Sequence, residues 1–310
     1  MISCTEFIPA YSELFTYLEA EHGRDEVDRF WEYLFDPDHS PLFAFLEKEG
    51  LKGCWTYWKG TLNEEAANFT MYLNEKRGFY HNVMHWCPSK GRLLQLKDSI
   101  GVEPYHDYCL HCDLYRRAAE KSGLKYIYNF NGTDKAACSM LIYDPNVFDG
   151  RVIFDEDTLV MDRKASDNEY FHRDFHDSLN RGSHYVGEKY GEKELVEYLT
   201  RFTKNVYRPV MEATAEKGLQ AIADKIADTY EKEKALDVLS LELTDKNLVV
   251  KIKECPAVKH LTGKGLTMSP WYSYTTTVVM DVLAKAGGYQ FELISYDQAT
   301  GAAEYQFTVK

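Results

Sequence analysis

The sequence lacks any apolar run long enough to cross a membrane, and its start lacks a basic segment followed by an apolar one. A membrane-spanning helix needs about 20 consecutive apolar residues. A secretory signal peptide needs a short basic segment before its apolar stretch. We therefore expect neither a membrane span nor a signal peptide, and we predict a cytosolic protein.

Cationic residues are also scarce, because 36 lysines and arginines stand against 49 aspartates and glutamates, a net charge of -13. Nucleic-acid binding depends on Lys and Arg side chains that neutralise phosphates, so no nucleic-acid partner is expected. The seven cysteines, an odd number in a reducing compartment, favour thiols or metal ligands over disulfides. Aromatic residues are abundant, with 23 tyrosines, and such side chains fill cores and line small-molecule pockets.

An internal repeat runs through the chain at an offset of 168 residues. The stretch "EHGRDEVDRFWEYL" from Glu21 corresponds to "KYGEKELVEYLTRF" from Lys189, and Cys87 corresponds to Cys255, each before a proline. Prolines and glycines between these points keep the same offset. Because a fixed period indicates repeated architecture, we predict a tandem duplication.

Both copies show helical periodicity first, then a strand-like run, a helix, and two closing strands joined by a turn. The predicted strands are 79–86, 124–130 and 137–143 in the first copy, and 248–254, 289–295 and 303–309 in the second. Helices on one side of an antiparallel sheet make an α+β domain. We predict a first α+β repeat at 1–148, a connecting segment at 149–167 and a second repeat at 168–310.

The stretch "PYHDYCLHCD", residues 104–113, holds a C-x-x-C pair, Cys109 and Cys112. We place this pair at a helix N-terminus, where the helix dipole lowers the thiol pKa and favours the thiolate. Cys87 ends one predicted strand and Cys138 begins another, so four thiols are available for a tetrahedral metal ion such as zinc. Inert buried thiols and a redox or nucleophilic cysteine are the alternatives.

Four further side chains are candidates in the first copy. His111 lies inside the C-x-x-C pair as an additional metal ligand, and Asp113, one turn beyond Cys109, is a candidate catalytic group. His81 and His85 alternate along a predicted strand that ends near Cys87, so the three would share one face as a row of ligands. The alternative is the exposed face of a half-buried strand.

The stretch "FHRDFHD" places His172 and His176 four residues apart on a predicted helix. This is a metal-ligand spacing, and a neutral histidine can also act as a general base near pH 7. Two surface histidines beside aspartates are the alternative. Cys255 and His260 are weaker candidates, because they fit a structural corner at a strand end.

The order of these motifs resembles the L-2-amino-thiazoline-4-carboxylic acid hydrolase family and, more distantly, the 4-vinyl reductase domain. The second copy carries the resemblance through "YFHRDFHDSLNRG" (170–182), "KYGEKELVEYL" (189–199) and "KECPAVKHL" (253–261), and the first copy through "HWCPSK", "YCLHCD" and "AACSMLIYD". The resemblance implies a helical layer against a curved sheet that encloses a pocket for a small organic molecule. Some relatives hydrolyse a ring C–N or C–S bond, and others are sensors of aromatic effectors, some with a cysteine-ligated zinc.

The two copies differ where the resemblance expects a Cys or His, because Thr275–Thr277 occupy the positions of Cys109–His111. We therefore expect a hydrolase-like enzyme whose metal, zinc by preference, is held in the first copy, with His172 or His176 as base or further ligand. An iron–sulfur cluster or haem are the other cofactors considered. The alternative function is an aromatic- or tetrapyrrole-binding or sensor protein with a structural cysteine-bound metal.

Overall fold

The computed structural model describes residues 1–35 and 40–309; residues 36–39 and Lys310, which fall in the two predicted repeats, lie outside the described residues. The chain forms two compact units. Unit 1 comprises Met1–Tyr17, Leu96–Val102 and Arg173–Lys310, and unit 2 comprises Leu18–Gln95 and Glu103–His172. Each unit packs helices against an antiparallel sheet, which confirms the predicted α+β class. None of the helices in the described part of the chain is both long and apolar enough to span a membrane.

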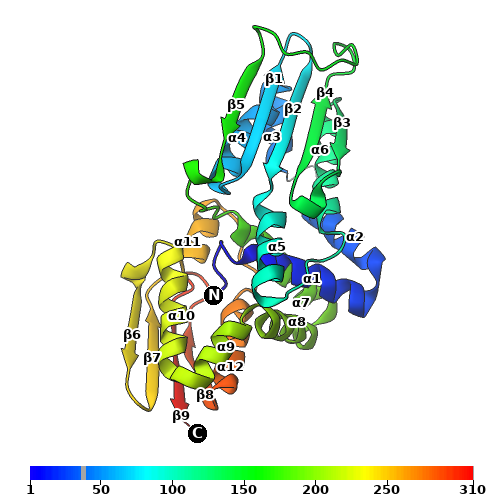
Figure 1. Cartoon of the computed structure of the whole chain (residues 1–310). Coiled ribbons are helices and arrows are strands. Elements are labelled where there is room, and N and C mark those ends of the chain that lie inside the picture. Colours follow the sequence, from blue (N-terminus) through cyan, green and yellow to red (C-terminus); the bar gives the residue numbers. More distant parts are fainter. Residues whose placement is uncertain (36–39, 310) are drawn as a thin grey trace. The chain divides into compact units, whose positions relative to one another are not determined.

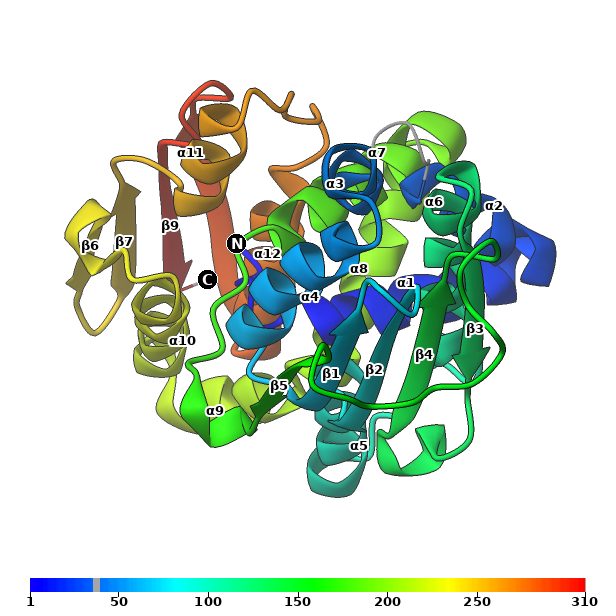
Figure 2. The same cartoon turned by 90° about the horizontal axis from the view of Figure 1, so that it is seen from above.

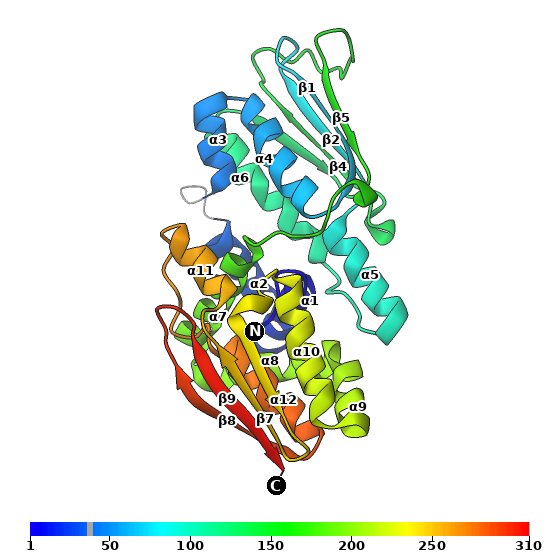
Figure 3. The same ribbon diagram turned by 90° about the vertical axis from the view of Figure 1, so that its left-hand side faces the viewer.

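Unit 2 contains a five-stranded sheet in the order β3-β4-β2-β1-β5. Its strands are β1 (Asn68–Asn74), β2 (Phe79–Trp86), β3 (Lys125–Asn129), β4 (Cys138–Tyr143) and β5 (Leu159–Arg163). Its helices are α2 (Arg24–Leu34), α3 (Pro41–Glu49), α4 (Lys52–Glu64), α6 (Tyr115–Lys121) and the 3-10 helices Tyr108–Leu114, Thr133–Lys135 and Ala165–Asp167. Helices α3, α4 and α6 cover one face of the sheet (Figures 2 and 3).

The faces of this sheet follow from alternation along β2. Tyr80, Asn82 and Met84 are buried beneath the helices, whereas His81 and His85 are less buried on the other face. The indole of Trp58 on α4 stacks on Tyr80 with ring centroids 5.4 Å apart. Large aromatic contacts of this kind hold α4 against the sheet.

Unit 1 contains a four-stranded sheet in the order β6-β7-β9-β8. Its strands are β6 (Leu239–Leu243), β7 (Asn247–Ile252), β8 (Tyr289–Tyr296) and β9 (Ala303–Val309). Its helices are α7 (Phe175–Tyr190), α8 (Glu192–Val206), α9 (Arg208–Lys217), α10 (Leu219–Lys232), α11 (Pro256–Gly263), α12 (Tyr274–Ala286) and the 3-10 helix Leu236–Val238. Helices α10 and α12 pack on this sheet (Figure 1).

Two helices, α1 (Phe7–His22) and α5 (Pro88–Ile100), contribute residues to both units. Helix α7 begins and ends 168 residues after α1, and β7 and α11 begin 168 residues after β2 and α5. The strand order β3-β4-β2-β1 corresponds to β8-β9-β7-β6. The two halves therefore share element order and strand order.

The predicted strands correspond to β2, β3, β4, β7, β8 and β9, whereas β1, β5 and β6 were missed. The segment 149–167 contains β5, which pairs antiparallel with β1 and extends the sheet of unit 2. Strands β1 and β6 were missed because one strand was predicted after the helices of each half, where the structure has a hairpin.

The units differ from the predicted boundaries at Leu96–Val102, which lies in unit 1, and at the two segments that precede α1 and α7. The backbone N–H of Cys4, before α1, donates to Oε1 of Glu233 at 2.6 Å, so the segment lies in unit 1. The backbone N–H of Phe171, before α7, donates to the carbonyl oxygen of Glu64 at 2.8 Å, so that segment lies in unit 2. The segment before α1 thus belongs to the unit built mainly from the C-terminal half of the chain, and the segment before α7 belongs to the unit built from the N-terminal half. We call these two segments the lead segments of α1 and α7.

Two helical glycines give a matched test of packing. A Cβ at Gly187 on α7 would lie 2.4 Å from Cγ of Trp271, whereas a Cβ at Gly60 on α4 would meet nothing within 4 Å. We expect Gly187→Ala to lower the free energy of unfolding by about 1–3 kcal/mol through overpacking, and Gly60→Ala to raise it by up to about 1 kcal/mol. Urea unfolding of both variants checks this; equal effects would contradict the close approach of Trp271 to α7.

Candidate metal centre

Three side chains of unit 1 lie close enough together to bind one metal ion. Cys4, His176 and Glu233 bring one sulfur, one ring nitrogen and one carboxylate oxygen within 4.8 Å of one another. All three side chains are buried. Among residues 1–35 and 40–309, no other group of three or more His, Cys, Asp or Glu side chains has this spacing.

Each ligand comes from a different part of the chain. Cys4 lies in the segment before α1, His176 in the first turn of α7, and Glu233 directly after α10. Lys234 follows in a left-handed conformation with φ of 55°, and the N–H of Ala235 donates to the carbonyl of Tyr230 at 2.9 Å. Such a left-handed residue ends a helix by turning the chain, and here it leaves Glu233 buried while Lys234 is exposed.

The hydrogen bonds of the centre leave one atom unsatisfied. Oε1 of Glu233 accepts the backbone N–H of Cys4 at 2.6 Å and lies 3.1 Å from Nε2 of His176. The hydroxyl of Tyr272 lies 3.3 Å from the other ring nitrogen of His176, Nδ1. Oε2 of Glu233 is buried without a hydrogen-bond partner. Because a buried carboxylate oxygen without a partner is costly, this atom fits a ligand at the centre.

Two of the three side chains of the centre have shifted pKa values. Burial raises the pKa of the Cys4 thiol, and the neighbouring carboxylate of Glu233 raises that pKa further. Burial alone would raise the pKa of Glu233 too, but the hydrogen bond and charge of His176 hold it below its usual range. A divalent metal ion would compensate the carboxylate and allow the thiol to ionise, because a coordinating thiol is deprotonated.

The donor set fits zinc. Cysteine sulfur, histidine nitrogen and glutamate oxygen are all zinc ligands, and three protein ligands leave a fourth position for water or substrate. A metal-bound histidine is normally oriented by a partner on its second ring nitrogen, and the Tyr272 hydroxyl occupies that place beside His176. The residues present therefore suit a metal ion.

The predicted pairing of His172 with His176 on one helix face is wrong. Helix α7 begins at Phe175, so His172 precedes it and belongs to unit 2, where its Nδ1 lies 2.6 Å from Oε2 of Glu64. His176 belongs to unit 1 and contacts Glu233. The chain passes from unit 2 to unit 1 between the two histidines.

The four predicted cysteine ligands converge in unit 2. Cys87, Cys109, Cys112 and Cys138 all interact electrostatically with one another. Cys138 accepts a hydrogen bond from the hydroxyl of Tyr128 at 3.0 Å. However, no three of these sulfurs lie within 4.8 Å of one another. A tetrahedral zinc ion with Zn–S bonds of about 2.3 Å would require them to move closer together.

The predicted lowering of the C-x-x-C thiol pKa values does not occur. Burial raises the pKa of Cys109 to about 11 and that of Cys112 well above its usual range. Both residues lie in the 3-10 helix Tyr108–Leu114, which precedes α6. Desolvation of these partly buried thiols therefore outweighs any helix-end dipole.

His111 lies beside this cysteine group. Its Nδ1 contacts the carbonyl oxygen of Tyr108, and its Nε2 lies 3.6 Å from the sulfur of Cys112. A carbonyl can only accept, so Nδ1 carries the proton and Nε2 faces the thiol with its lone pair. Burial lowers the pKa of His111 to about 4, which keeps the imidazole neutral as a metal ligand must be.

Asp113 pairs with an arginine, and His85 lies on the other side of the sheet from these groups. Asp113 forms a half-exposed ion pair with Arg116 at 2.6 Å. His85 follows Met84 on β2 and therefore faces the opposite side of the sheet from Cys138, which pairs with Met84. The Nε2 atom of His85 lies 2.7 Å from the hydroxyl of Thr70. Of the predicted row, His81 and His85 share a face of β2, but Cys87 does not continue it because β2 ends at Trp86.

Two residues of the centre were missed by sequence reasoning. Cys4 lies opposite His172 at the 168-residue offset, and Glu233 lies opposite Glu65. The repeat thus contained a signal, since a ligand-type residue recurs at each of these positions. What it could not show is that Cys4 joins the C-terminal half of the chain.

No family model matches the chain, and no curated protein matches it. The fold and the centre together define an α+β protein with two similar units, one of which holds a buried Cys–His–Glu group suited to a metal ion.

Proposed function

We propose that the chain is a cytosolic, metal-dependent enzyme of hydrolase type that acts on a C–N or C–S bond of a small cyclic molecule. The convergence of Cys4, His176 and Glu233 within 4.8 Å carries this proposal. The resemblance of 170–182 and 253–261 to amino-thiazoline-carboxylate hydrolases supports the reaction class. When bound, zinc would supply a Lewis acid that polarises the substrate.

The surrounding residues hold the ligands in place. The hydroxyl of Tyr272 orients the ring of His176, and the backbone N–H of Cys4 fixes Oε1 of Glu233. The guanidinium of Arg173 donates from Nη2 to the backbone carbonyl of Glu233 at 3.2 Å. Because these contacts are already made, little reorganisation is needed to bind the metal.

Metal analysis with a matched cysteine variant tests the proposal. We expect about one zinc ion per chain in the wild type and in Cys54→Ala, which removes another buried thiol from unit 2. Cys4→Ala should lose the metal, because only two protein ligands remain. A chelator should abolish hydrolysis of a thiazoline carboxylate and leave the circular dichroism spectrum unchanged. A wild-type chain that binds no zinc on reconstitution would refute the proposal.

A ligand-binding or sensor protein with a structural metal is the second candidate. The observation that favours it is burial, because Cys4, His176 and Glu233 are 0%, 1% and 0% exposed. Structural zinc sites are closed, whereas catalytic sites keep an open position. Unfolding of the chain by chelator would support this candidate, and a coloured sample would identify an iron–sulfur cluster or haem instead.

We also infer that the two halves arose by tandem duplication. The shared strand order and the constant 168-residue offset between equivalent elements support this origin. After duplication only one half acquired the Cys–His–Glu set, since Ile8 stands at the position equivalent to His176.

A further inference from the structure

Strand β5 forms one edge of the sheet of unit 2, beside β1 (Figure 1). In the described part of the chain, β1 is the only strand that pairs with it, and their register is regular throughout. Leu159 and Val160, on opposite faces of β5, are 50% and 57% exposed. An edge strand presents a row of backbone N–H and C=O groups with which another strand can pair. Pairing at this edge would also bury the two apolar side chains.

The charge around β5 changes sign along the strand. Glu156 and Asp157 lie in the turn just before it, whereas Arg163 is its last residue and Lys164 follows directly. Asp157 and Arg163 are six residues apart, a length that spans about 20 Å in an extended strand. The acidic end of β5 therefore cannot pair with the basic end of the same strand.

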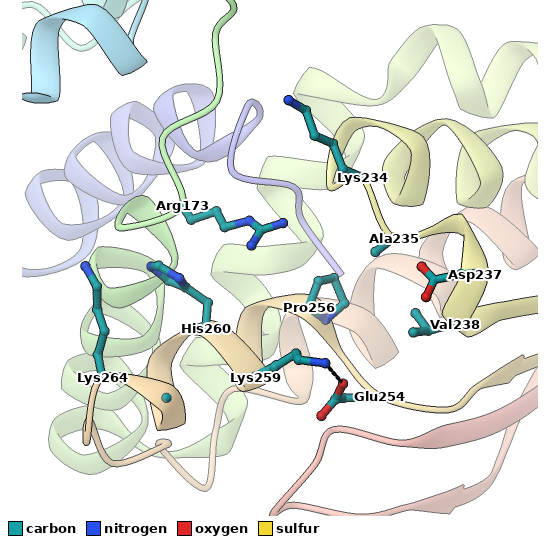
Figure 4. Close-up of a pocket in the computed structure, with 11 residues that line it drawn as sticks. Arg173, Lys234, Ala235, Asp237, Val238, Glu254, Pro256, Lys259, His260 and Lys264 are labelled. Atoms are coloured by element: carbon teal, nitrogen blue, oxygen red, sulfur yellow. Dashed lines mark hydrogen bonds and ion pairs between the residues drawn. The ribbon is translucent and has the colours of Figure 1, made fainter.

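The cavity beside α11 in unit 1 shows a different arrangement of surface charge. There Nζ of Lys259 pairs with Oε2 of Glu254 at 2.5 Å (dashed in Figure 4), and Lys264 pairs with Asp174. Each of these pairs closes within the chain. The two ends of β5 can be brought together only when a second, antiparallel strand lies beside it.

Antiparallel pairing of β5 with β5 of a second copy, centred on Val160, brings opposite charges together. Each residue then lies opposite the one equally far beyond Val160. Asp157 meets Arg163 of the second copy, and Glu156 meets Lys164. Because the arrangement is two-fold symmetric, each of these pairs forms twice. Opposite charges directly across two strands stabilise the pairing.

Neighbouring registers lack this match. Side chains alternate between the faces of a strand, so a two-fold axis that keeps each side chain on its face passes through a residue. An axis at Leu159 places Glu156 opposite Asp162, two like charges. An axis at Met161 places Asp162 opposite the apolar Val160. The sequence of β5 thus favours the register centred on Val160 over those on either side.

We propose that a second copy of this chain docks on β5 in this register and joins the two sheets of unit 2 into one continuous sheet. Backbone hydrogen bonds and the burial of Leu159 and Val160 supply the affinity. The charges select the register, because exposed ion pairs contribute little by themselves. Asp157 also pairs with Lys76 at 2.7 Å, and its carboxylate has room for a second donor.

Sedimentation of the full chain at up to about 100 μM tests the docking surface. We expect a dimer for the wild type and at least about a 10-fold weaker dimer for Val160→Asp, which places two carboxylates at the axis. Ile127→Asp is the matched control, because Ile127 is 51% exposed on β3, the other edge strand of the same sheet. A monomeric wild type, or equal effects of the two substitutions, would overturn the proposal.

Charge reversal tests the register without changing the apolar centre. Arg163→Glu and Asp157→Arg should each weaken the dimer at least about 10-fold, since each places like charges opposite each other at both ends. A mixture of the two variants should form a heterodimer with an affinity near that of the wild type, because both pairs then have opposite charges. Variants that dimerise as the wild type does, or a mixture no tighter than either variant alone, would contradict this register.

Discussion

Replacing Glu233 with glutamine is expected to weaken zinc binding by more than about 100-fold, because loss of an outer partner of a ligand already costs about 10- to 100-fold. The glutamine keeps the size of the side chain and an acceptor for the Cys4 N–H, but it removes the negative charge and a carboxylate ligand. Competition with a chelator of known zinc affinity measures the change.

Glu13→Gln is the matched control for this experiment. Glu13 is also a buried glutamate of unit 1, and its Oε2 accepts a hydrogen bond from Asn205 at 3.0 Å, away from the metal group. It should retain the zinc affinity of the wild type. If Glu233→Gln binds zinc as tightly as Glu13→Gln, the carboxylate is not a ligand.

The stability of unit 2 is expected to fall by about 3 kcal/mol between pH 6.5 and pH 4 because of His111 alone. Burial lowers the pKa of His111 to about 4 in the folded chain, against 6.5 when it is unfolded. The neutral form is therefore favoured by folding. Its contribution is complete above pH 6.5 and is lost as the pH falls towards 4, because the unfolded chain takes up the proton first.

Urea unfolding of the wild type and of His111→Asn at several pH values measures this contribution. Asparagine retains a donor near the Nδ1 position for the Tyr108 carbonyl but does not titrate. The difference in unfolding free energy between the two proteins should shrink as the pH falls from 6.5 to 4. His106→Asn is the control, because the His106 side chain is 63% exposed. A constant difference for His111→Asn across this range would show that His111 is not held neutral.

Local pattern was enough for most of the fold. The predicted strands 289–295 and 303–309 correspond to β8 and β9, and 79–86 matches β2 residue for residue. These strands can be predicted from the sequence because they depend on the alternation and residue types of a few consecutive positions. The hairpin partners β1 and β6 were missed, since they follow directly on helices without a clear break in the sequence.

For the four cysteines of unit 2, residue type and position in the sequence predicted that they come together, but not the pKa of their thiols. Cys87, Cys109, Cys112 and Cys138 do converge, because strand ends and a following helix start meet at one end of the sheet. The lowered pKa expected for Cys109 and Cys112 was wrong in sign, because burial raises the pKa of both thiols and depends on every neighbour in space. His85 was also predicted as a metal ligand beside these cysteines, but the alternation of side chains along β2 places it on the other face of the sheet.

The candidate metal centre depended on tertiary structure more than any other feature. The sequence alone indicated His176 as a candidate ligand, the 168-residue repeat and the α+β class. These follow from periodicity and internal similarity, which are properties of the sequence. That Cys4 meets Glu233, while His172 meets Glu64, follows only from the exchange of lead segments between the two halves. Cys4 and Glu233 are 229 residues apart in the sequence. Their contact depends on which surfaces of the chain become buried against each other on folding, and a local sequence pattern does not determine this.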